Sequence, residues 1–200
     1  NTNGAQNNTI QNNTISLDRN YSNTFGVYSN VRHIDGPLSA DVTTLADITN
    51  STTAPNSGNK VYTNAISNVD HGIVFIGSLT AANMDVGNDI GGSSAGTGNS
   101  ITNFGNLGAA TAYAGYTVTL VEGVYALNQL GSNISFNTVT SALQNTGTLA
   151  LRGMLQDFSV APLAATTCNV NSNTVGMSNA GVSSIQAITS GGVASPNVTM

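Results

Sequence analysis

Charged residues are scarce in this sequence. Lys and Arg number four and Asp and Glu nine, so charged residues make up 6% of the 200-residue chain, against roughly 25% in ordinary soluble domains. Four cations cannot neutralise a phosphate backbone, which argues against a nucleic-acid partner. The same shortage argues against a polybasic contact with a membrane surface. Asn, Thr, Ser and Gly take the place of the charges, so amides and hydroxyls are expected to hydrate the surface.

Cysteine is nearly absent as well. Cys168 is the only one, so no disulfide can form within the chain. A buried thiol is the expected state, and a disulfide with another copy of the chain is the alternative. No apolar run approaches the length of a membrane span. The chain begins at Asn1 without a signal peptide, which is the pattern that a precursor trimmed after export would leave.

Lysine is almost missing, which leaves few sites for trypsin-like proteases. Asn-x-Ser/Thr acceptors for glycosylation occur at Asn7, Asn12, Asn20, Asn50, Asn133 and Asn197. In a chain so rich in Asn, Ser and Thr, most such triplets arise by chance. Together these features predict a secreted protein that works outside the cell or at its surface.

Residues that could carry catalysis are too few to form a recognisable site. His33 lies near Asp35 and Asp70 precedes His71, but no GxSxG motif occurs, and close neighbours in a strand do not adopt triad geometry. Two His and one Cys make a poor zinc site. We predict no enzyme and no cofactor. Asp85 and Asp89 are weak calcium candidates, since their spacing is not that of an EF-hand and solvated loop acids are the default.

Short apolar runs separated by polar connections predict an all-β chain. The densest, Tyr116 to Leu127, is interrupted by Glu122-Gly123 and is interpreted as a β-hairpin or a sharply bent strand. Gly72 to Leu79 is expected to be a strand buried on both faces. The pattern favours a single β-sandwich or jelly-roll-like domain. A β-solenoid is the alternative, because Asn and Gly turns recur, although no fixed period extends beyond one pentapeptide.

That pentapeptide marks the N-terminal segment. Gln6 to Ile10 (QNNTI) is followed by the same five letters at Gln11 to Ile15. We predict that residues 1–20 form an extended arm and residues 21–200 a single β-rich domain. The arm has too few apolar residues to fold alone, so an exposed sheet edge, in the same subunit or a neighbour, should order it. Ile10, Ile15 and Leu17 are the candidate assembly residues.

Three functions agree with these features. The first is a structural subunit of an extracellular filament, pilus-like appendage or sheath, a homopolymer joined by strand addition of the arm. The second is a surface adhesin or glycan-binding β-sandwich module that contacts surface glycans through the Gly- and Asn-rich residues 83–106. The third is a viral or phage coat or fibre protein. The composition is similar to that of secreted pilus and appendage subunits in general.

Two further expectations concern the few ionisable groups. Lys60 and Glu122, the single Lys and the single Glu, are candidates for a cross-link in which a buried lysine condenses with an Asn side chain while the acid shuttles the proton. An exposed lysine and an exposed turn glutamate are the simpler alternative. Because titratable groups are few, stability is expected to vary little with pH.

Overall fold

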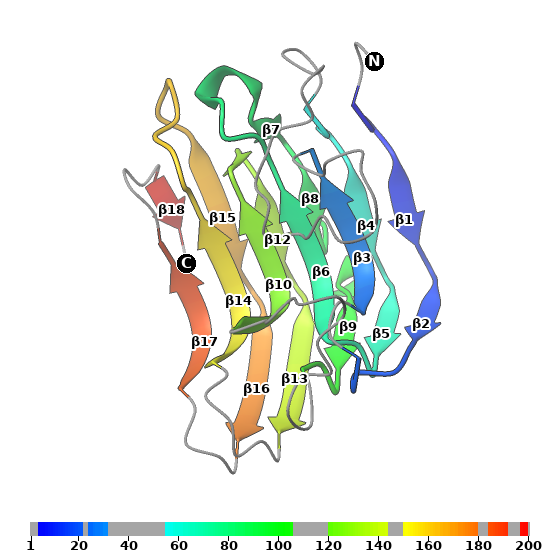
Figure 1. The fold of residues 1–200 in the computed structure, drawn as a ribbon. Coiled ribbons are helices and arrows are strands. Elements are labelled where there is room, and N and C mark those ends of the chain that lie inside the picture. Colours follow the sequence, from blue (N-terminus) through cyan, green and yellow to red (C-terminus); the bar gives the residue numbers. More distant parts are fainter. Residues whose placement is uncertain are drawn as a thin grey trace.

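The chain folds into parallel β-sheets in which successive turns of the backbone stack on one another (Figure 1). This computed structural model describes residues 4–21, 24–31, 55–105, 120–143, 150–179, 184–191 and 197–199. Every strand pair among these residues is parallel. Parallel strands that return to the same sheet turn after turn define a β-solenoid.

Three large sheets and one strand pair make up this stack. We call the large ones sheets A, B and D. Sheet A has the order β1 (Thr9–Gln11), β4 (Lys60–Tyr62), β8 (Asp89–Ile90), β12 (Asn133–Ser135), β15 (Thr167–Asn171) and β18 (Asn197–Thr199). Sheet B has the order β2 (Thr14–Ser16), β5 (Ala65–Ser67), β9 (Ser100–Thr102), β13 (Thr138–Leu143) and β16 (Thr174–Asn179). Sheet D contains β3 (Phe25–Asn30), β6 (His71–Ile76), β10 (Leu120–Leu127), β14 (Ala150–Asp157) and β17 (Ile185–Ser190).

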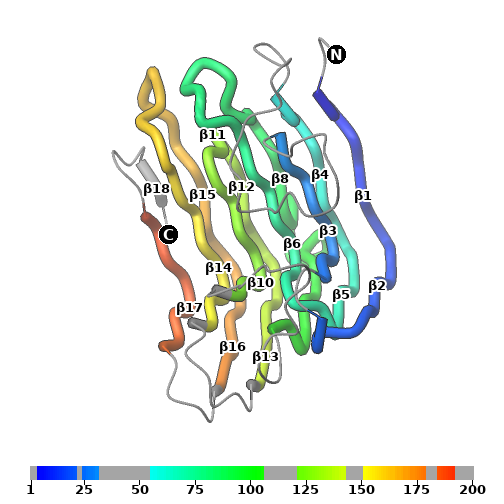
Figure 2. Tube along the Cα trace, viewed as in Figure 1, coloured from blue at the N-terminus to red at the C-terminus, as the bar shows by residue number. Residues whose placement is uncertain are grey.

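The remaining elements are short. The strand pair joins β7 (Asp85–Val86) to β11 (Gln129–Leu130), and two 3-10 turns, η1 (Ala81–Asn83) and η2 (Ala95–Thr97), lie in the third turn of the solenoid. Each full turn therefore crosses sheets A, B and D once. We call each turn a rung. The tube view shows the rungs side by side, with the N-terminal strands at one end of the stack and the C-terminal strands at the other (Figure 2).

The odd period of the pentapeptide is explained by a corner between sheets A and B. Asn12 adopts φ 59° at this corner, and Thr63, Phe136 and Ser172 have positive φ at the same place in later rungs. Three strand residues plus a two-residue bend make five. Ile10 and Ile15 therefore both pack against the core, one from each sheet. On a flat strand, a separation of five residues would have placed these two side chains on opposite faces.

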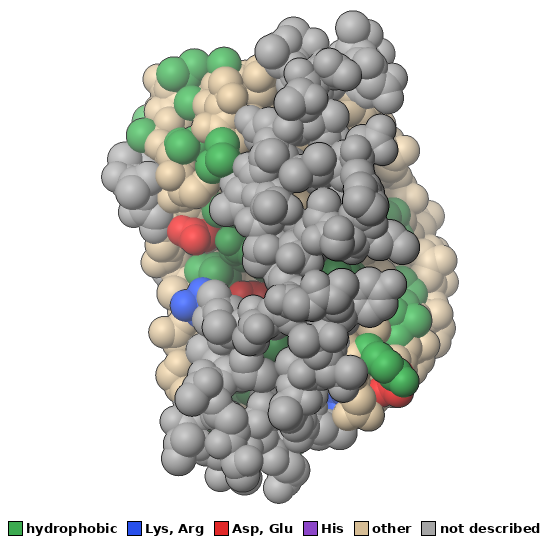
Figure 3. Space-filling model, viewed as in Figure 1, with side chains coloured by type: hydrophobic (Ala, Val, Ile, Leu, Met, Phe, Trp, Pro, Cys, Tyr) green, Lys and Arg blue, Asp and Glu red, His purple; other side chains and the backbone are tan. Residues whose placement is uncertain are grey.

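Aligned aliphatic side chains fill the interior. The register places Ile66, Ile101 and Val139 opposite one another in sheet B, and Val61, Ile90 and Ile134 in sheet A. All six are buried in the main core cluster, which also includes residues of sheet D. On the side drawn in Figure 3, few charged side chains are seen among the described atoms.

Glycines let sheet D approach sheet B closely. Gly72, Gly123 and Gly153 occupy neighbouring strands. A Cβ on Gly123 would lie against Val139 Cγ1 and 2.7 Å from the backbone oxygen of Gly153. Since real Cβ atoms do not approach so closely, only glycine fits in this row.

The prediction of a β-sandwich or jelly roll is wrong. Sandwich sheets are antiparallel, whereas the pairs described here are all parallel. The observed arrangement is the β-solenoid named as the alternative. Each rung contributes one strand to each face, so short strands and polar corners give the same sequence pattern as a sandwich.

The predicted hairpin at Glu122-Gly123 is also wrong, because both residues lie inside the continuous strand β10. The run Gly72 to Leu79 was correctly expected to hold a buried strand, since all six residues of β6 are buried. Residues 9–16 of the predicted arm form β1 and β2, which pair with β4 and β5 of the same chain.

Candidate functional site

A ladder of asparagines runs through the corner between sheets A and B. In Asn64, Asn99 and Asn137, the backbone N–H and Nδ2 both donate to Oδ1 of the Asn in the next rung, at 2.8 to 3.1 Å. Nδ2 also donates back to a main-chain oxygen of the preceding rung, for example from Asn99 to Val61 at 2.8 Å. Burial makes these bonds costly to lose, so the ladder fixes the register of the rungs.

The ladder has a direction, and its two ends differ. At one end, Asn13 donates to Asn64, and its Oδ1 accepts no hydrogen bond from the described residues. At the other end, Asn173 Oδ1 accepts from Asn137, and the backbone N–H of Asn173 has no acceptor among the described residues. One end therefore offers an acceptor and the other a donor.

The strand edges at these ends are open as well. Among the described strands, β1, β2 and β3 have a neighbour on one side only, and so do β16, β17 and β18. Most residues of β1 and β2 are exposed. An unpaired strand edge presents backbone N–H and C=O groups that can pair with another chain. The two ends are thus candidate assembly surfaces.

A second polar network surrounds Asp85, which is fully buried. Gln129 Nε2 donates to its Oδ2 at 2.8 Å and the backbone N–H of Asn56 donates to its Oδ1 at 2.7 Å. Gln129 Oε1 in turn accepts from Asn88. Burial disfavours the charged carboxylate and outweighs these two donors, which raises the pKa of Asp85 to about 7.

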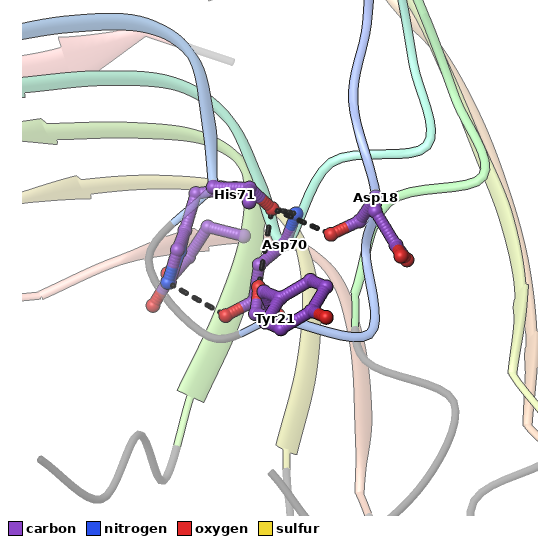
Figure 4. A network of polar contacts seen from close by, with 6 residues as sticks. Asp18, Tyr21, Asp70 and His71 are labelled. Atoms are coloured by element: carbon purple, nitrogen blue, oxygen red, sulfur yellow. Dashed lines mark hydrogen bonds and ion pairs between the residues drawn. The ribbon is translucent and has the colours of Figure 1, made fainter. Parts of the chain in front are cut away.

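A third polar cluster forms around His71, at the start of β6. Its Nδ1 lies 3.1 Å from Glu122 Oε2 and its Nε2 lies 3.5 Å from Asp70 Oδ2. Figure 4 shows Asp70 and His71 beside Asp18 and Tyr21, which follow β2. Burial opposes a charge on His71, but the hydrogen bond and charge of Glu122 and the charge of Asp70 prevail and raise the pKa of His71.

The position of this cluster indicates a structural role. His71 is 6% exposed and Glu122 3%, and the His71 ring stacks on Phe25 with centroids 5.0 Å apart. A catalytic base has to reach the proton that it abstracts. His71 instead bonds sideways to the neighbouring strand, so the cluster ties β6 to β10.

Both buried groups predict a pH dependence, in contrast to the flat profile expected from composition. The folded state binds a proton at Asp85 between about pH 4 and 7, where the unfolded carboxyl has released it, so stability falls as pH rises. The raised pKa of His71 acts in the same direction above about pH 6.5. We expect the melting temperature at pH 5 to exceed that at pH 8.5, with Asp85 contributing at most about 4 kcal/mol.

The slope of this profile is the test, measured by calorimetry at several pH values. Asp85→Asn should flatten it between pH 4 and 7, whatever its effect on absolute stability. Equal slopes in this variant and in the unaltered chain would show that Asp85 does not govern the profile.

The other candidate residues lie in separate places. Lys60 is exposed at the start of β4 in sheet A, whereas Glu122 is buried in sheet D beside His71. The cross-linking chemistry needs a buried lysine. Asp85 and Asp89 belong to different networks, since Asp89 accepts from Asn133, the backbone N–H of Gly92 and the hydroxyl of Tyr62.

The assembly and glycosylation candidates are also placed by the structure. Ile10 and Ile15 pack against the core, whereas Leu17 is 48% exposed. Asn7, Asn12 and Asn20 are exposed. Asn133 is engaged, because its Nδ2 donates to Asp89 and to Gly92 O. Asn197 lies in β18, and Asn50, His33 and Asp35 fall outside the described residues.

Cys168 is free and fully buried, as predicted. Its Sγ donates to the main-chain oxygen of Gln129 at 3.2 Å. In the register of sheet A, Cys168 follows Asn8, Asn59, Asn88 and Ser132. Cys168 thus lies at a position that small polar residues occupy in the other rungs.

Sequence reasoning missed the ladder, although a signal for it is present. In the pentapeptide, the pattern Asn-x-Ile occurs twice, five residues apart. The same pattern, with Val or Ile at its third position, occurs five residues apart at Asn59 and Asn64. The pairs Ser132/Asn137 and Cys168/Asn173 keep the spacing of five with another first residue. The third rung differs, because Asn88 and Asn99 are separated by the insertion that holds η2. A search for two such triplets five residues apart, with any residue allowed at the first position, would have found four of the five rungs.

Comparisons with protein families, with curated proteins and with solved structures find no match to this chain. In the part of the chain that the structure describes, no helix is long and apolar enough to cross a membrane. Within the same residues, no group of three or more His, Cys, Asp or Glu side chains is arranged to hold a metal ion.

Proposed function

We propose that this chain is a structural subunit of an extracellular filament or sheath, in which copies join end to end through β1 and β2. The observation that supports this most is the opposite polarity of the two ladder ends. Asn13 presents an acceptor at one end and Asn173 a donor at the other. Within the stack, this same donor–acceptor pair joins each rung to the next.

The repeating register defines how two copies would meet. Asn173 of one copy would donate to Asn13 of the next, so that β2 pairs with β16 in the way that β5 pairs with β2. Ile15 would then align with Val175, extending the aliphatic row of sheet B. Main-chain pairing and a continuous apolar row are the two sources of affinity in strand addition.

β18 sets a condition for this joint. The edge of β15 that β1 of the next copy would use is occupied by β18, which pairs Asn169 with Thr199. Joining in register therefore requires β18 to leave β15. The exchange replaces a three-residue strand by a two-strand rung, β1 and β2, so the joined state has more main-chain pairing.

Removal of residues 1–17 tests the proposal. The truncated chain should stay folded, because the later rungs keep their mutual pairing, but it should not form filaments. Removal of residues 197–200 should have the opposite effect and speed assembly by freeing β15. Circular dichroism checks the fold, and electron microscopy with sedimentation measures the assembly.

The two deletions give distinct readouts. If the chain without residues 1–17 still assembles normally, β1 and β2 do not form the joint. If the chain without residues 197–200 assembles no faster than the full chain, β18 does not block the edge of β15 against the next copy.

A further inference from the structure

Sheet B carries a groove of about 400 Å³. Its lining residues come from two adjacent strands, β13 and β16, and the bend after β9: Asn103, Thr140, Ser141, Ala142, Gly176, Met177 and Ser178. This volume is within the range of about 300–1,000 Å³ that is usual for small-ligand sites. All seven residues lie in the part of the chain that the structure describes.

The groove forms where a row of hydroxyls is interrupted. Register places Ser16, Ser67, Thr102, Thr140 and Gly176 in one row across the five strands of sheet B. The first four present hydroxyls, and Gly176 presents no side chain. Among the described residues, a Cβ at Gly176 would meet only Thr140 Cγ2, at an ordinary 3.5 Å. With respect to the described residues, the hollow over Gly176 therefore has room for a larger side chain.

The chemistry of the groove selects for a neutral ligand. None of its lining residues is charged, and none of the residues in the five strands of sheet B is either. A charged ligand placed here would lose water without gaining an ion partner, which is costly. The lining residues include no aromatic ring, so a flat base or ring would find no stacking platform.

The groups that remain match a sugar. The exposed amide of Asn103 donates and accepts, and the hydroxyls of Thr140 and Ser178 do both. The Ala142 methyl group and the bare backbone at Gly176 offer apolar surface between them. Hydroxyl-rich ligands with C–H faces need this mixture of paired polar groups and small apolar patches.

We propose that this groove binds one or two units of an uncharged glycan, and that the row of hydroxyls leading from it contacts further units. Successive rungs are about 4.8 Å apart, so a glycan chain lying along the solenoid axis would meet a hydroxyl of Ser16, Ser67, Thr102 or Thr140 at each rung. The groove and the end-to-end joint share β16, but the groove uses side chains of this strand and the joint uses its main-chain edge.

NMR titration with neutral tetrasaccharides tests the proposal directly. The probes are cellotetraose, chitotetraose, maltotetraose and mannotetraose, with a galacturonate trimer as the charged comparison. One neutral probe should give saturable shifts at the Asn103 side-chain amide and the Gly176 backbone amide. Gly176→Thr, which fills the hollow, should weaken that binding at least tenfold. Thr140→Val keeps shape and strand propensity but removes one hydroxyl, and it should weaken binding severalfold.

Gly96→Thr is the matched control. Gly96 lies in η2, outside the groove, and among the described residues a Cβ there would meet only Ser94 Oγ, at 4.0 Å. It should bind as the unaltered chain does. The proposal is overturned if no neutral tetrasaccharide shifts these amides, if the galacturonate trimer binds more tightly than all of them, or if Gly176→Thr binds as Gly96→Thr does.

Discussion

Replacing Gly123 by alanine is expected to lower the free energy of unfolding by about 3 kcal/mol or more, the upper part of the range for overpacked cores. The added Cβ would press on Val139 Cγ1 and on the backbone oxygen of Gly153, 2.7 Å away. A backbone oxygen cannot turn aside as a flexible side chain can. The strands of sheet D and sheet B would have to separate, which would loosen the core that both sheets help to form.

Gly176→Ala is the control for this substitution. It makes the same chemical change in a neighbouring sheet, where the new Cβ meets Thr140 Cγ2 at 3.5 Å. It should be neutral or stabilise by about 0.5 kcal/mol, since alanine restricts the unfolded chain more than glycine. Urea unfolding of the two variants checks the difference. Equal losses would mean that the close approach of sheets B and D is not the reason for glycine at 123.

Replacing Asn137 by alanine should cost about 4 kcal/mol. Its side chain accepts from Asn99 N and Nδ2 and donates to Ile90 O at 2.9 Å. Alanine removes these three buried hydrogen bonds, and although Asn99 Nδ2 still donates to Val61 O, each buried group left unsatisfied costs about 1–3 kcal/mol. A loss of this size is a large part of the total free energy of unfolding of a single domain.

Asn13→Ala removes the same side chain at the end of the ladder. Asn13 is exposed and bonds to Asn64 from one side only, so its loss should cost about 1 kcal/mol. The comparison is made by urea unfolding at one pH. If Asn13→Ala and Asn137→Ala destabilise equally, burial of the ladder does not determine its strength.

Local features of the fold were readable from the sequence. The apolar run after Gly72 predicted a buried strand because β-branched and aromatic residues without alternating polarity need cover on both faces. The scarcity of charge predicted a surface of amides and hydroxyls, and sheet B is such a surface. Strand content follows from composition and short-range pattern, which a solenoid and a sandwich share.

The stacking of rungs could not be read in the same way. The ladder residues Asn13, Asn64, Asn99, Asn137 and Asn173 follow one another at intervals of 51, 35, 38 and 36 residues. Four of the five corners keep the same spacing, but the connections between sheets B, D and A vary in length, so no fixed period appears. Glu122-Gly123 was misinterpreted because glycine marks a turn in most strands, whereas here it marks contact with another sheet.

Side-chain amide contacts measured by NMR test the central claim, the stacking of parallel rungs on an asparagine ladder, most directly. The solenoid predicts nuclear Overhauser effects between the Nδ2 protons of Asn64 and Asn99, and between those of Asn99 and Asn137. It predicts none between Asn64 and Asn137, which are separated by a rung. The solenoid would be contradicted by strong Hα–Hα contacts between paired strands, which are the mark of antiparallel pairing, together with no contacts between the amides of the ladder.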